Sequence, residues 1–382
     1  MTITEFFHRF FTRPGKATVR AVVAGGNTLL GLLTIFSAYG GAIDPEVCVL
    51  ASLMAMALPV FLILGVLLLV LDLCFWKKAS LVLIASWAVA IKPILAFAPL
   101  NIGGHSLSQE ERENSFTFLT YNVLHFWDFR GHSVGLEQNA TIDYILDLDA
   151  DIVSLQEADM LKEWPLWRIT RGQIQQLAEQ YPFRAVCVDD QFTVLSKYPF
   201  VRDRLDVPAR WKSKFSFYRL SMKGQVVHLA NCHLQSIGLT PDDKTLYRSL
   251  VKSEAEITRR EVDEVKNTLL RKLQNAFLER RSQAEYLRHV IDSIGGNWIV
   301  AGDFNDIPAC YAVRTIMDGD MHDAYAEEAF GPTITYHGSM FYFRIDQVLY
   351  KGDFQAVDIT RGSSPASDHY SLLTTFVFDQ DK

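Results

Sequence analysis

The sequence predicts a membrane domain of about three transmembrane helices followed by an outer domain of the α/β or α+β class. Of the 382 residues, 49% are hydrophobic and 21% are charged, and the first hundred residues contain only seven Lys or Arg and four acids. The remaining residues alternate short apolar runs with amphipathic segments. Five cysteines and abundant aromatic residues exclude both a disulfide scaffold and a disordered chain.

Three apolar stretches fill the N-terminal part of the chain, over residues 19–43, 47–76 and 79–100. Each stretch reaches the roughly 20 residues that a helix needs to cross a bilayer core. Helices of that length and hydrophobicity are rare in soluble domains, so we expect three spans, with a kink in the second at Pro59.

The basic residues predict the orientation of these spans, because cytoplasmic loops are rich in Lys and Arg. Four basic residues precede the first span, a Lys pair separates the second from the third, and the first loop contains only acids: Arg9, Arg13, Lys16, Arg20, Lys77, Lys78, Asp44 and Glu46. We therefore expect a multi-pass protein of the plasma or inner membrane. Its N-terminus would be cytoplasmic and its outer domain extracytoplasmic. The pattern gives no role to Lys92 in the third stretch.

Residues 1–100 thus form the predicted membrane domain, residues 101–114 read as a polar linker, and residues 115–382 form the outer domain. Short runs rich in β-branched and aromatic residues predict buried strands, among them FTFLTYNVL, DIVSLQE, VVHLANCHL, NWIVAG and SLLTTFVF. Apolar residues at three- and four-residue steps over 254–294 predict an amphipathic helix with a break near Ser282.

Polar side chains stand at the ends of these apolar runs or inside them. The set comprises Asn122, Gln156, Glu157, Asn231, His233, Asp303, Asn305, Asp346, Asp368 and His369. Leaving one such group buried without a partner costs about 1–3 kcal/mol. A domain with so many of these polar groups therefore needs common partners for them. We expect these side chains to converge on a single site.

The chemistry that fits this set is metal-assisted phosphoester hydrolysis. Carboxylate and amide oxygens are ligands for Mg²⁺ or Mn²⁺ and not for structural zinc. Such an ion polarises a phosphoryl oxygen, and a histidine near neutral pKa accepts a proton from water. Asp346 and His369 suit a pair in which the carboxylate orients the imidazole, and His233 suits a contact with the leaving oxygen. Each residue alone has an ordinary structural explanation as a core or turn residue.

The ordered set TYNV, LQE, NCHL, GDFN, RIDQV and SDH resembles the endonuclease/exonuclease/phosphatase superfamily of metal-dependent phosphoesterases over residues 115–380. The superfamily includes deoxyribonucleases, abasic-site endonucleases, inositol-polyphosphate phosphatases and neutral sphingomyelinases. The resemblance implies a four-layer sandwich of two mixed β-sheets flanked by helices.

The resemblance also implies a role for each matching residue. Glu157 and Asn122 would hold the divalent ion, with help from Asp368. His233 would contact the phosphate or act as acid, Asp303 and Asn305 would orient water and the scissile phosphate, and Asp346 would orient the base His369. Gln347 departs from the family, which often has Tyr or His there, and we expect it to tune the substrate pocket.

The substrate is less constrained. The outer domain has a net charge of −10 against +3 for residues 1–100, which disfavours tight binding of a polyanion. A basic patch remains possible at Lys212, Lys214 and Arg219, whereas the pairs Arg259–Arg260 and Arg280–Arg281 are expected on a solvated helix surface. Six aromatic residues suit lipid contact, base stacking or plain packing: Trp164, Trp167, Trp211, Phe215, Phe217 and Tyr218.

A membrane tether favours a lipid head group or a small phosphodiester as substrate, with extracytoplasmic nucleic acid next and a phosphomonoester third. The lipid bilayer is the one expected partner besides the substrate, and no protein partner is inferred. The hypothesis from another class is a membrane interaction module whose outer domain binds without turnover.

Overall fold

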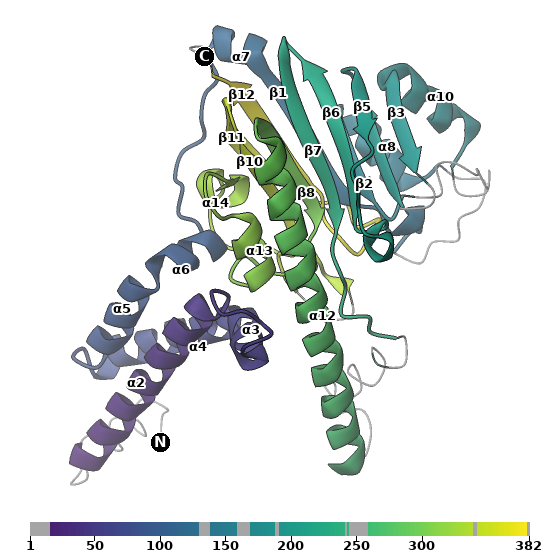
Figure 1. Ribbon diagram of the computed structural model, residues 1–382. Helices are drawn as coiled ribbons and strands as arrows, with labels where there is room; N and C mark the ends of the chain where they lie inside the picture. The colour runs from purple at the N-terminus through teal and green to yellow at the C-terminus, as the bar shows by residue number, and fades with distance from the viewer. Residues whose placement is uncertain are drawn as a thin grey trace. The chain divides into compact units, whose positions relative to one another are not determined.

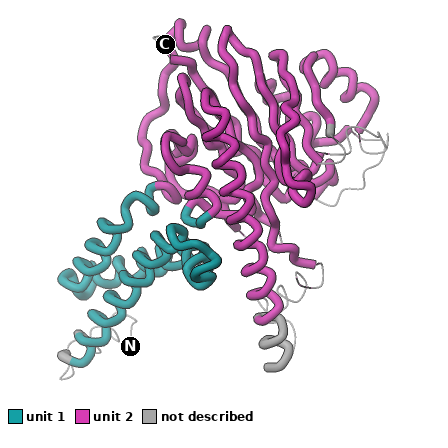
Figure 2. Tube along the Cα trace, viewed as in Figure 1, with its two compact units in different colours: residues 1–95, 309–311 teal, residues 96–308, 312–382 magenta. Residues whose placement is uncertain are grey.

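The computed structural model describes residues 16–129, 138–158, 169–187, 191–240, 243, 259–338 and 342–379. Within the described residues the chain forms two compact units (Figures 1 and 2). One comprises residues up to Leu95 together with Ala309–Tyr311, and the other comprises the rest.

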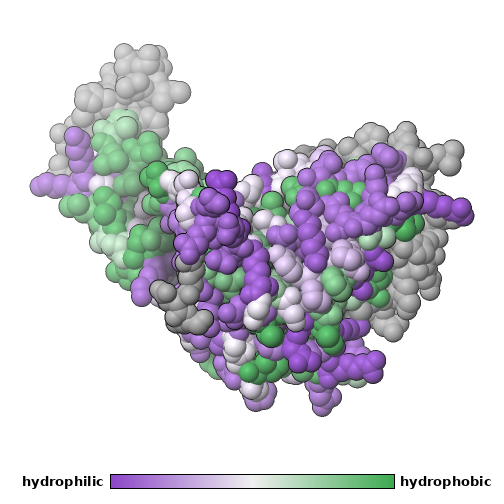
Figure 3. Space-filling model, turned by 90° about the horizontal axis from the view of Figure 1, so that it is seen from above, coloured by the Kyte–Doolittle hydropathy of each residue, from purple (hydrophilic) through white to green (hydrophobic). Residues whose placement is uncertain are grey.

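The N-terminal unit is helical and apolar. Figure 3 shows hydrophobic residues gathered at the left of the view and in smaller patches elsewhere, and many large apolar side chains of the N-terminal unit are exposed. Two helices are long and apolar enough to cross a membrane, over Ala21–Gly40 and Leu58–Phe75. The helices are α2 (Lys16–Gly40), α3 (Val49–Met56), α4 (Leu58–Phe75), α5 (Ser80–Val89) and α6 (Ile91–Phe97).

The expected third span is bent by 80° between α5 and α6, so the described helices supply two spans, or three if the bent pair counts as one. Pro93 explains the break, because it lacks the N–H that would bond to the carbonyl of Val89. That carbonyl instead accepts a hydrogen bond from the Tyr39 hydroxyl at 2.8 Å. The second stretch is likewise interrupted at Ala57, two residues before Pro59.

The second unit contains two six-stranded mixed sheets. The first has the order β11-β12-β1-β2-β4-β3, in which β1 and β2 are parallel and their neighbours antiparallel. Helix α8 (Ala140–Leu148) makes the crossover between these two parallel strands. The strands are β1 (Ser115–Asn122), β2 (Ile152–Gln156), β3 (Phe183–Cys187), β4 (Phe192–Ser196), β11 (Phe354–Arg361) and β12 (Leu372–Phe378).

The second sheet has the order β5-β6-β7-β8-β10-β9, and its parallel pair is β7 with β8. The crossover between them contains α12 (Arg259–Ile294), followed after β8 by α13 (Tyr311–Ile316) and α14 (Ala324–Glu328). The strands are β5 (Phe200–Asp203), β6 (Phe215–Met222), β7 (Gln225–His233), β8 (Asn297–Asp303), β9 (His322–Asp323) and β10 (Asp346–Lys351).

Three apolar clusters hold these layers together. The first fills the space between the sheets and includes Phe118, Leu229 and Phe376. The second packs α12 and α13 on the outer face of the second sheet. The third packs α8 and α10 (Arg171–Gln180) on the outer face of the first sheet. Two mixed sheets flanked by helices are therefore present, as predicted, because alternate residues of the central strands face different clusters.

Two sequence expectations for connecting segments change. Residues 109–114, expected within a polar linker, form the helix α7 (Gln109–Asn114), which begins with a capping box of Ser108 and Glu111. Helix α12 also continues through Ser282, whose hydroxyl donates to the carbonyl of Leu278 inside the helix. A serine that bonds back to its own helix leaves the helix unbroken.

The expectation that the Arg280–Arg281 pair lies on a solvated surface is wrong for Arg280. Its side chain is fully buried, and its Nε donates to Asp306 Oδ2 at 3.1 Å. One guanidinium nitrogen also donates to the carbonyl of Gln235. Helix α12 thereby fixes the loop that follows β8. The side chains of Arg259 and Arg260 lie outside the described residues.

The aromatic segment from Trp211 to Tyr218 belongs to the core. Phe215 and Phe217 pack beneath α12, and Tyr218 lies between the sheets. Because all four aromatic side chains of this segment are buried, they offer no surface to lipid or bases. Trp164 and Trp167 lie outside the described residues.

The buried ion pair gives a stability prediction. Asp306→Ala leaves the Arg280 charge uncompensated in the core, so we expect a loss of about 3 kcal/mol in unfolding free energy. Glu285→Ala is the matched control, since it removes the exposed partner of Arg281 on the same helix. That change should cost less than about 0.5 kcal/mol. Denaturant unfolding measures both, and equal costs would contradict the assignment.

Candidate active site

The strand topology gathers the predicted polar residues at one edge of the two sheets. In the first sheet Asn122 is in register with Gln156 at the carboxyl ends of β1 and β2. In the second sheet Asp303 is in register with His233 on β7 and, on its other side, with Asp346 at the start of β10. Parallel strands end at the same edge, and an antiparallel neighbour begins there. Segments far apart in sequence therefore meet.

Several residues at this edge have left-handed backbone conformations, which residues other than glycine rarely adopt. Glu157 and Asn305 have φ angles of 52° and 51°, and His125 has a φ of 51°. Gly302, with a φ of 134°, has no space for a Cβ, which would lie 2.1 Å from the carbonyl oxygen of Cys232. Left-handed backbone at non-glycine residues is costly and clusters at functional sites. The glycine of GDFN is thus required by strand packing.

Two carboxylates face each other across the sheets. The amide nitrogen of Asn122 lies 3.3 Å from Glu157 Oε1 and 3.2 Å from Asp303 Oδ2, and donates to both. The Nε2 atom of His233 lies 3.7 Å and 3.6 Å from the same two oxygens. Glu157 retains 22% of its side-chain exposure, whereas Asp303 is buried. Solvent therefore reaches the pair from the Glu157 side.

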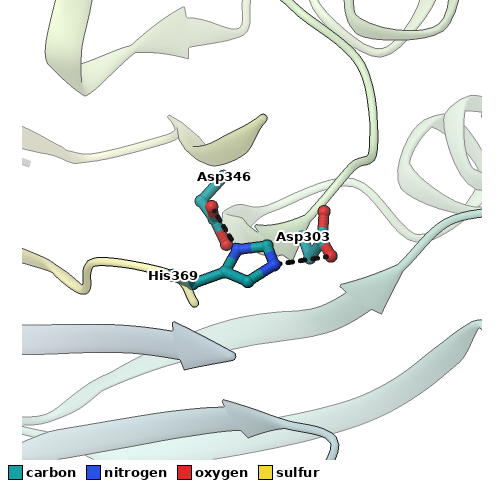
Figure 4. Close-up of side chains that lie close together, drawn as sticks. All are labelled: Asp303, Asp346 and His369. Carbon is teal, nitrogen blue, oxygen red and sulfur yellow. Dashed lines mark hydrogen bonds and ion pairs between the residues drawn. The ribbon is translucent and has the colours of Figure 1, made fainter. Parts of the chain in front are cut away.

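His369 stands between two further carboxylates (Figure 4). Its Nδ1 lies 2.9 Å from Asp346 Oδ2, and its Nε2 lies 3.7 Å from Asp303 Oδ2. All three side chains are buried. The predicted pair of Asp346 and His369 is thus in hydrogen-bond contact, and Asp303 belongs to both halves of the cluster.

Charge and burial shift the pKa values of these groups. Burial lowers the pKa of His369, but the carboxylates of Asp346 and Asp303 outweigh it and raise the pKa to about 10. Burial raises the pKa of Asp303, and the Asp346 carboxylate adds to the rise against the opposing effect of His369. Burial lowers the pKa of His233 despite the nearby Glu157. At neutral pH His369 is therefore charged and His233 neutral.

Polar contacts behind these residues hold them in place. The hydroxyl of Ser367 donates to the carbonyl of Asn122 and accepts from the backbone N–H of His369. The side chain of Gln156 donates to Asn231 Oδ1 at 2.8 Å, a fully buried hydrogen bond between the two sheets. Gln156 and Asn231, which the sequence placed among the converging residues, therefore join the sheets behind the site.

The remaining predicted residues lie at the same edge. Asn305 donates from its backbone to Asp303 Oδ1 and from its side chain to the carbonyl of Leu234. Asp368 directly precedes His369, and its carbonyl accepts a hydrogen bond from His337. The side chain of Gln347 is buried and donates to the carbonyls of Asp306 and Arg344. It therefore supports the loop that follows β8, and its role in tuning the substrate pocket stays a prediction.

The donor atoms fit a divalent cation. Asp303, Asp346 and His369 offer ligand atoms that all lie within 4.8 Å of one another. In that trio, however, the imidazole is already bonded to Asp346. Glu157 and Asp303 present hard oxygen donors beside the partly open side of the site. A cation between the carboxylates would offset their repulsion, and the Asn122 amide, which donates to both, provides part of that compensation in the structure.

Sequence reasoning missed His125 and Tyr336 at the site, and it named Lys214 only as part of a possible basic patch. The Nε2 of His125 lies 3.4 Å from Glu157 Oε2. The ammonium of Lys214 feels the charges of Asp303 and Glu157, although burial lowers its pKa. The ring of Tyr336 lies 4.9 Å from His369, and burial together with the charge of Asp368 raises its pKa. Of these residues, only Lys214 could have been placed at the site from the sequence. The expected pairing of β6 with β7 puts it opposite His233, whose backbone N–H donates to the carbonyl of Lys214.

The raised pKa of His369 makes a pH-dependent prediction. A raised folded-state pKa adds stability that is present below the unfolded pKa and is lost as pH rises through the folded value, here about 10. We expect Asp346→Asn to lower the unfolding free energy at pH 7, with a smaller difference from the parent protein above about pH 10. Denaturant unfolding at several pH values measures this, and a difference independent of pH would contradict it.

Comparisons with known proteins agree with the geometry. Residues 119–369 match the model of the Endonuclease/Exonuclease/phosphatase family, and residues 20–97 match a domain of unknown function. No curated protein sequence matches the chain.

Among solved structures, a truncated Caenorhabditis elegans TDP2 is 17% identical, covers 69% of this chain and 98% of its own, and has a TM-score of 0.43. Sphingomyelinase C from Streptomyces griseocarneus is 17% identical, with coverage of 68% and 99% and a TM-score of 0.40. The Bacteroides vulgatus endonuclease/exonuclease/phosphatase is 16% identical, with coverage of 69% and 99% and a TM-score of 0.42. The family match spans more than half of the chain and includes the whole polar cluster, from Asn122 to His369. The chain therefore belongs to the endonuclease/exonuclease/phosphatase family of metal-dependent phosphoesterases.

Proposed function

We propose that the protein is a membrane-anchored phosphodiesterase that uses Mg²⁺ or Mn²⁺ and acts outside the cytoplasm on a lipid head group or small phosphodiester. The observation that carries the proposal is the meeting of Asn122, Glu157, His233, Asp303 and His369 within hydrogen-bond or ion-pair distance. These residues come from both sheets, and no structural need explains so many buried or partly buried ionisable groups in one place.

The cation, when bound, supplies Lewis-acid polarisation of a phosphoryl oxygen. Glu157 is the proposed main ligand, because its carboxylate is the most solvent-accessible of the central pair. Asn122 and Asp368 are proposed to assist it. In the structure the Asn122 amide nitrogen faces the carboxylates and its oxygen accepts from the backbone N–H of Leu124. That contact supports a role in holding the carboxylates together.

The proposed proton transfers involve three side chains. Asp346 holds Nδ1 of His369, which fixes the orientation of the imidazole. Because two carboxylates keep His369 protonated, its Nε2 suits donation to a phosphoryl oxygen, and Asp303 suits acceptance of the proton from the attacking water. The alternative, with His369 as the base, requires its neutral form. His233 is neutral and suits contact with the leaving oxygen.

Substrate binding is assigned to groups around this centre. The side chain of Asn305 lies beside Asp303 and suits contact with the scissile phosphate. Lys214 is partly buried, and its ammonium feels the charges of Asp303 and Glu157, so it suits contact with a phosphate oxygen. The second candidate function is an extracytoplasmic nuclease, which the same centre would serve. The acidic outer domain favours a smaller substrate.

The direct test compares hydrolysis of bis-p-nitrophenyl phosphate with Mg²⁺ or Mn²⁺ by the parent protein and by Glu157→Gln and His369→Ala. We expect each variant to fold and to lose at least about a hundredfold in rate, the usual contribution of a positioned catalytic group. Glu285→Gln, an exposed carboxylate on α12, is the control and should retain full activity. Equal turnover by all four proteins would refute the proposal and favour the non-catalytic module.

The proposed orientation depends on the number of spans. Three spans with a cytoplasmic N-terminus place the C-terminus outside, whereas two spans would return it to the cytoplasm. We expect alkaline phosphatase fused after Lys382 to be active in cells, because that reporter works only outside the cytoplasm. An inactive fusion, with an active fusion of a cytoplasmic reporter at the same residue, would mean that α5 and α6 do not cross.

A further inference from the structure

The segment that follows α6 is bound to the rest of the second unit. Helix α6 ends at Phe97. Only two residues later, Pro99 accepts a hydrogen bond at 2.6 Å from the backbone N–H of Gly331. Leu100 then forms an isolated antiparallel bridge with Phe330. Two residues of extended chain span at most about 7 Å, so this part of the catalytic unit begins where α6 ends.

A side chain strengthens this connection. The Nδ2 of Asn101 donates to the carbonyls of Ala326 and Ala329, at 3.0 Å in both cases. These carbonyls belong to α14 and the residue that follows it, and α14 packs against β11 of the first sheet and against β9 and β10 of the second. The connection is therefore made to a helix that packs on both sheets, and not to a loose loop.

The residues around this connection expose large apolar side chains. Leu100 is 63% exposed, Phe330 is 65% exposed and Ile102 is 88% exposed. Together they are called the apolar seat. A soluble surface gains nothing from three such side chains on one paired segment, and apolar patches of this kind mark contact surfaces. Leu100 and Ile102 lie within five residues of the end of the apolar helix α6, and Phe330 is paired with Leu100, so the bilayer is the surface that suits them.

The apolar seat is also close to the active site along the chain. From Gly331 the chain needs five residues to reach Tyr336, which forms a bridge with His369. Five residues extend at most about 17 Å. On the way, the hydroxyl of Thr335 accepts hydrogen bonds from the backbone N–H groups of Ile345 and Asp346. A single short segment, residues 331–336, thus connects the apolar seat to the catalytic centre.

We propose that the apolar seat inserts into the surface of the bilayer that the N-terminal helices enter, and holds the catalytic centre against it. The substrate class that fits this arrangement is a phosphodiester carried by a lipid of the same membrane. The phosphate of a lipid head group lies at the bilayer surface, where the apolar seat would insert. A freely diffusing diester is not held at that surface, so the seat would not help to bind it. This inference rests on the proposed function for its substrate and on the seat for its geometry.

The experiment uses the full chain in vesicles of phosphatidylethanolamine and phosphatidylglycerol. The seat variant combines Leu100→Ser, Ile102→Ser and Phe330→Ser. The control variant combines Val201→Ser and Val226→Ser, which are exposed apolar residues on β5 and at the start of β7. Strand β5 is the edge of the second sheet opposite β9, and β7 begins at the end of the sheet away from the site. The parent protein and both variants are assayed in parallel on bis-p-nitrophenyl phosphate and on the vesicle lipids.

We expect the seat variant to lose at least tenfold in lipid hydrolysis and to stay within twofold of the parent protein on the soluble diester. The control variant should match the parent on both substrates. Retention of lipid hydrolysis by the seat variant would overturn the proposal, as would an equal loss on both substrates. A parent protein that cleaves the soluble diester but no vesicle lipid would overturn the substrate class.

A second readout is independent of activity. A fluorophore attached through Phe330→Cys, with the native reactive cysteines replaced by serine, should be quenched by brominated lipids at least twice as strongly as one attached through Val226→Cys. Equal quenching would overturn the seat, and so would a label shielded only when the protein dimerises. If the parent protein cleaves neither substrate, the proposed function fails, while the quenching still decides whether the seat lies in the bilayer.

Discussion

The two sheets of the catalytic unit bring several carboxylates together at one edge. The structure there depends on contacts that compensate the repulsion among them. Asp303 is buried between the Asn122 amide, the His233 imidazole and the His369 imidazole, and each contact compensates part of its charge. Like charges at this spacing are tolerated only with such partners or with a cation. The site is therefore a strained arrangement, as the left-handed backbone at Glu157 also indicates.

The rest of the fold supplies what this arrangement needs. The parallel pairs β1 with β2 and β7 with β8 place four strand ends side by side, and a buried hydrogen bond between Gln156 and Asn231 ties the sheets together behind them. The ion pair of Arg280 with Asp306 anchors the loop that carries Asn305. The strands that form the core thus also carry the buried polar contacts and the residues of the site.

Much of this was predictable from sequence, because strand periodicity places polar residues at run ends and the motif order identifies the family. Contacts that depend on tertiary placement were not. The charge of Arg280 gave no sign that it would be buried, and Ser282 gave none that it would leave α12 intact. His125 and Tyr336 lie in irregular segments without a periodic signal. The third apolar stretch has span length, but Pro93 bends it.

The most direct test of the central claim is the binding of Mn²⁺ to the purified protein, measured by the loss of the free-ion electron paramagnetic resonance signal. If the carboxylates of Glu157 and Asp303 gather to hold a divalent cation, the parent protein binds Mn²⁺ and unfolds at a higher temperature in its presence. Glu157→Gln then binds at least tenfold more weakly and loses that stabilisation. Identical binding curves for the two proteins would contradict the account.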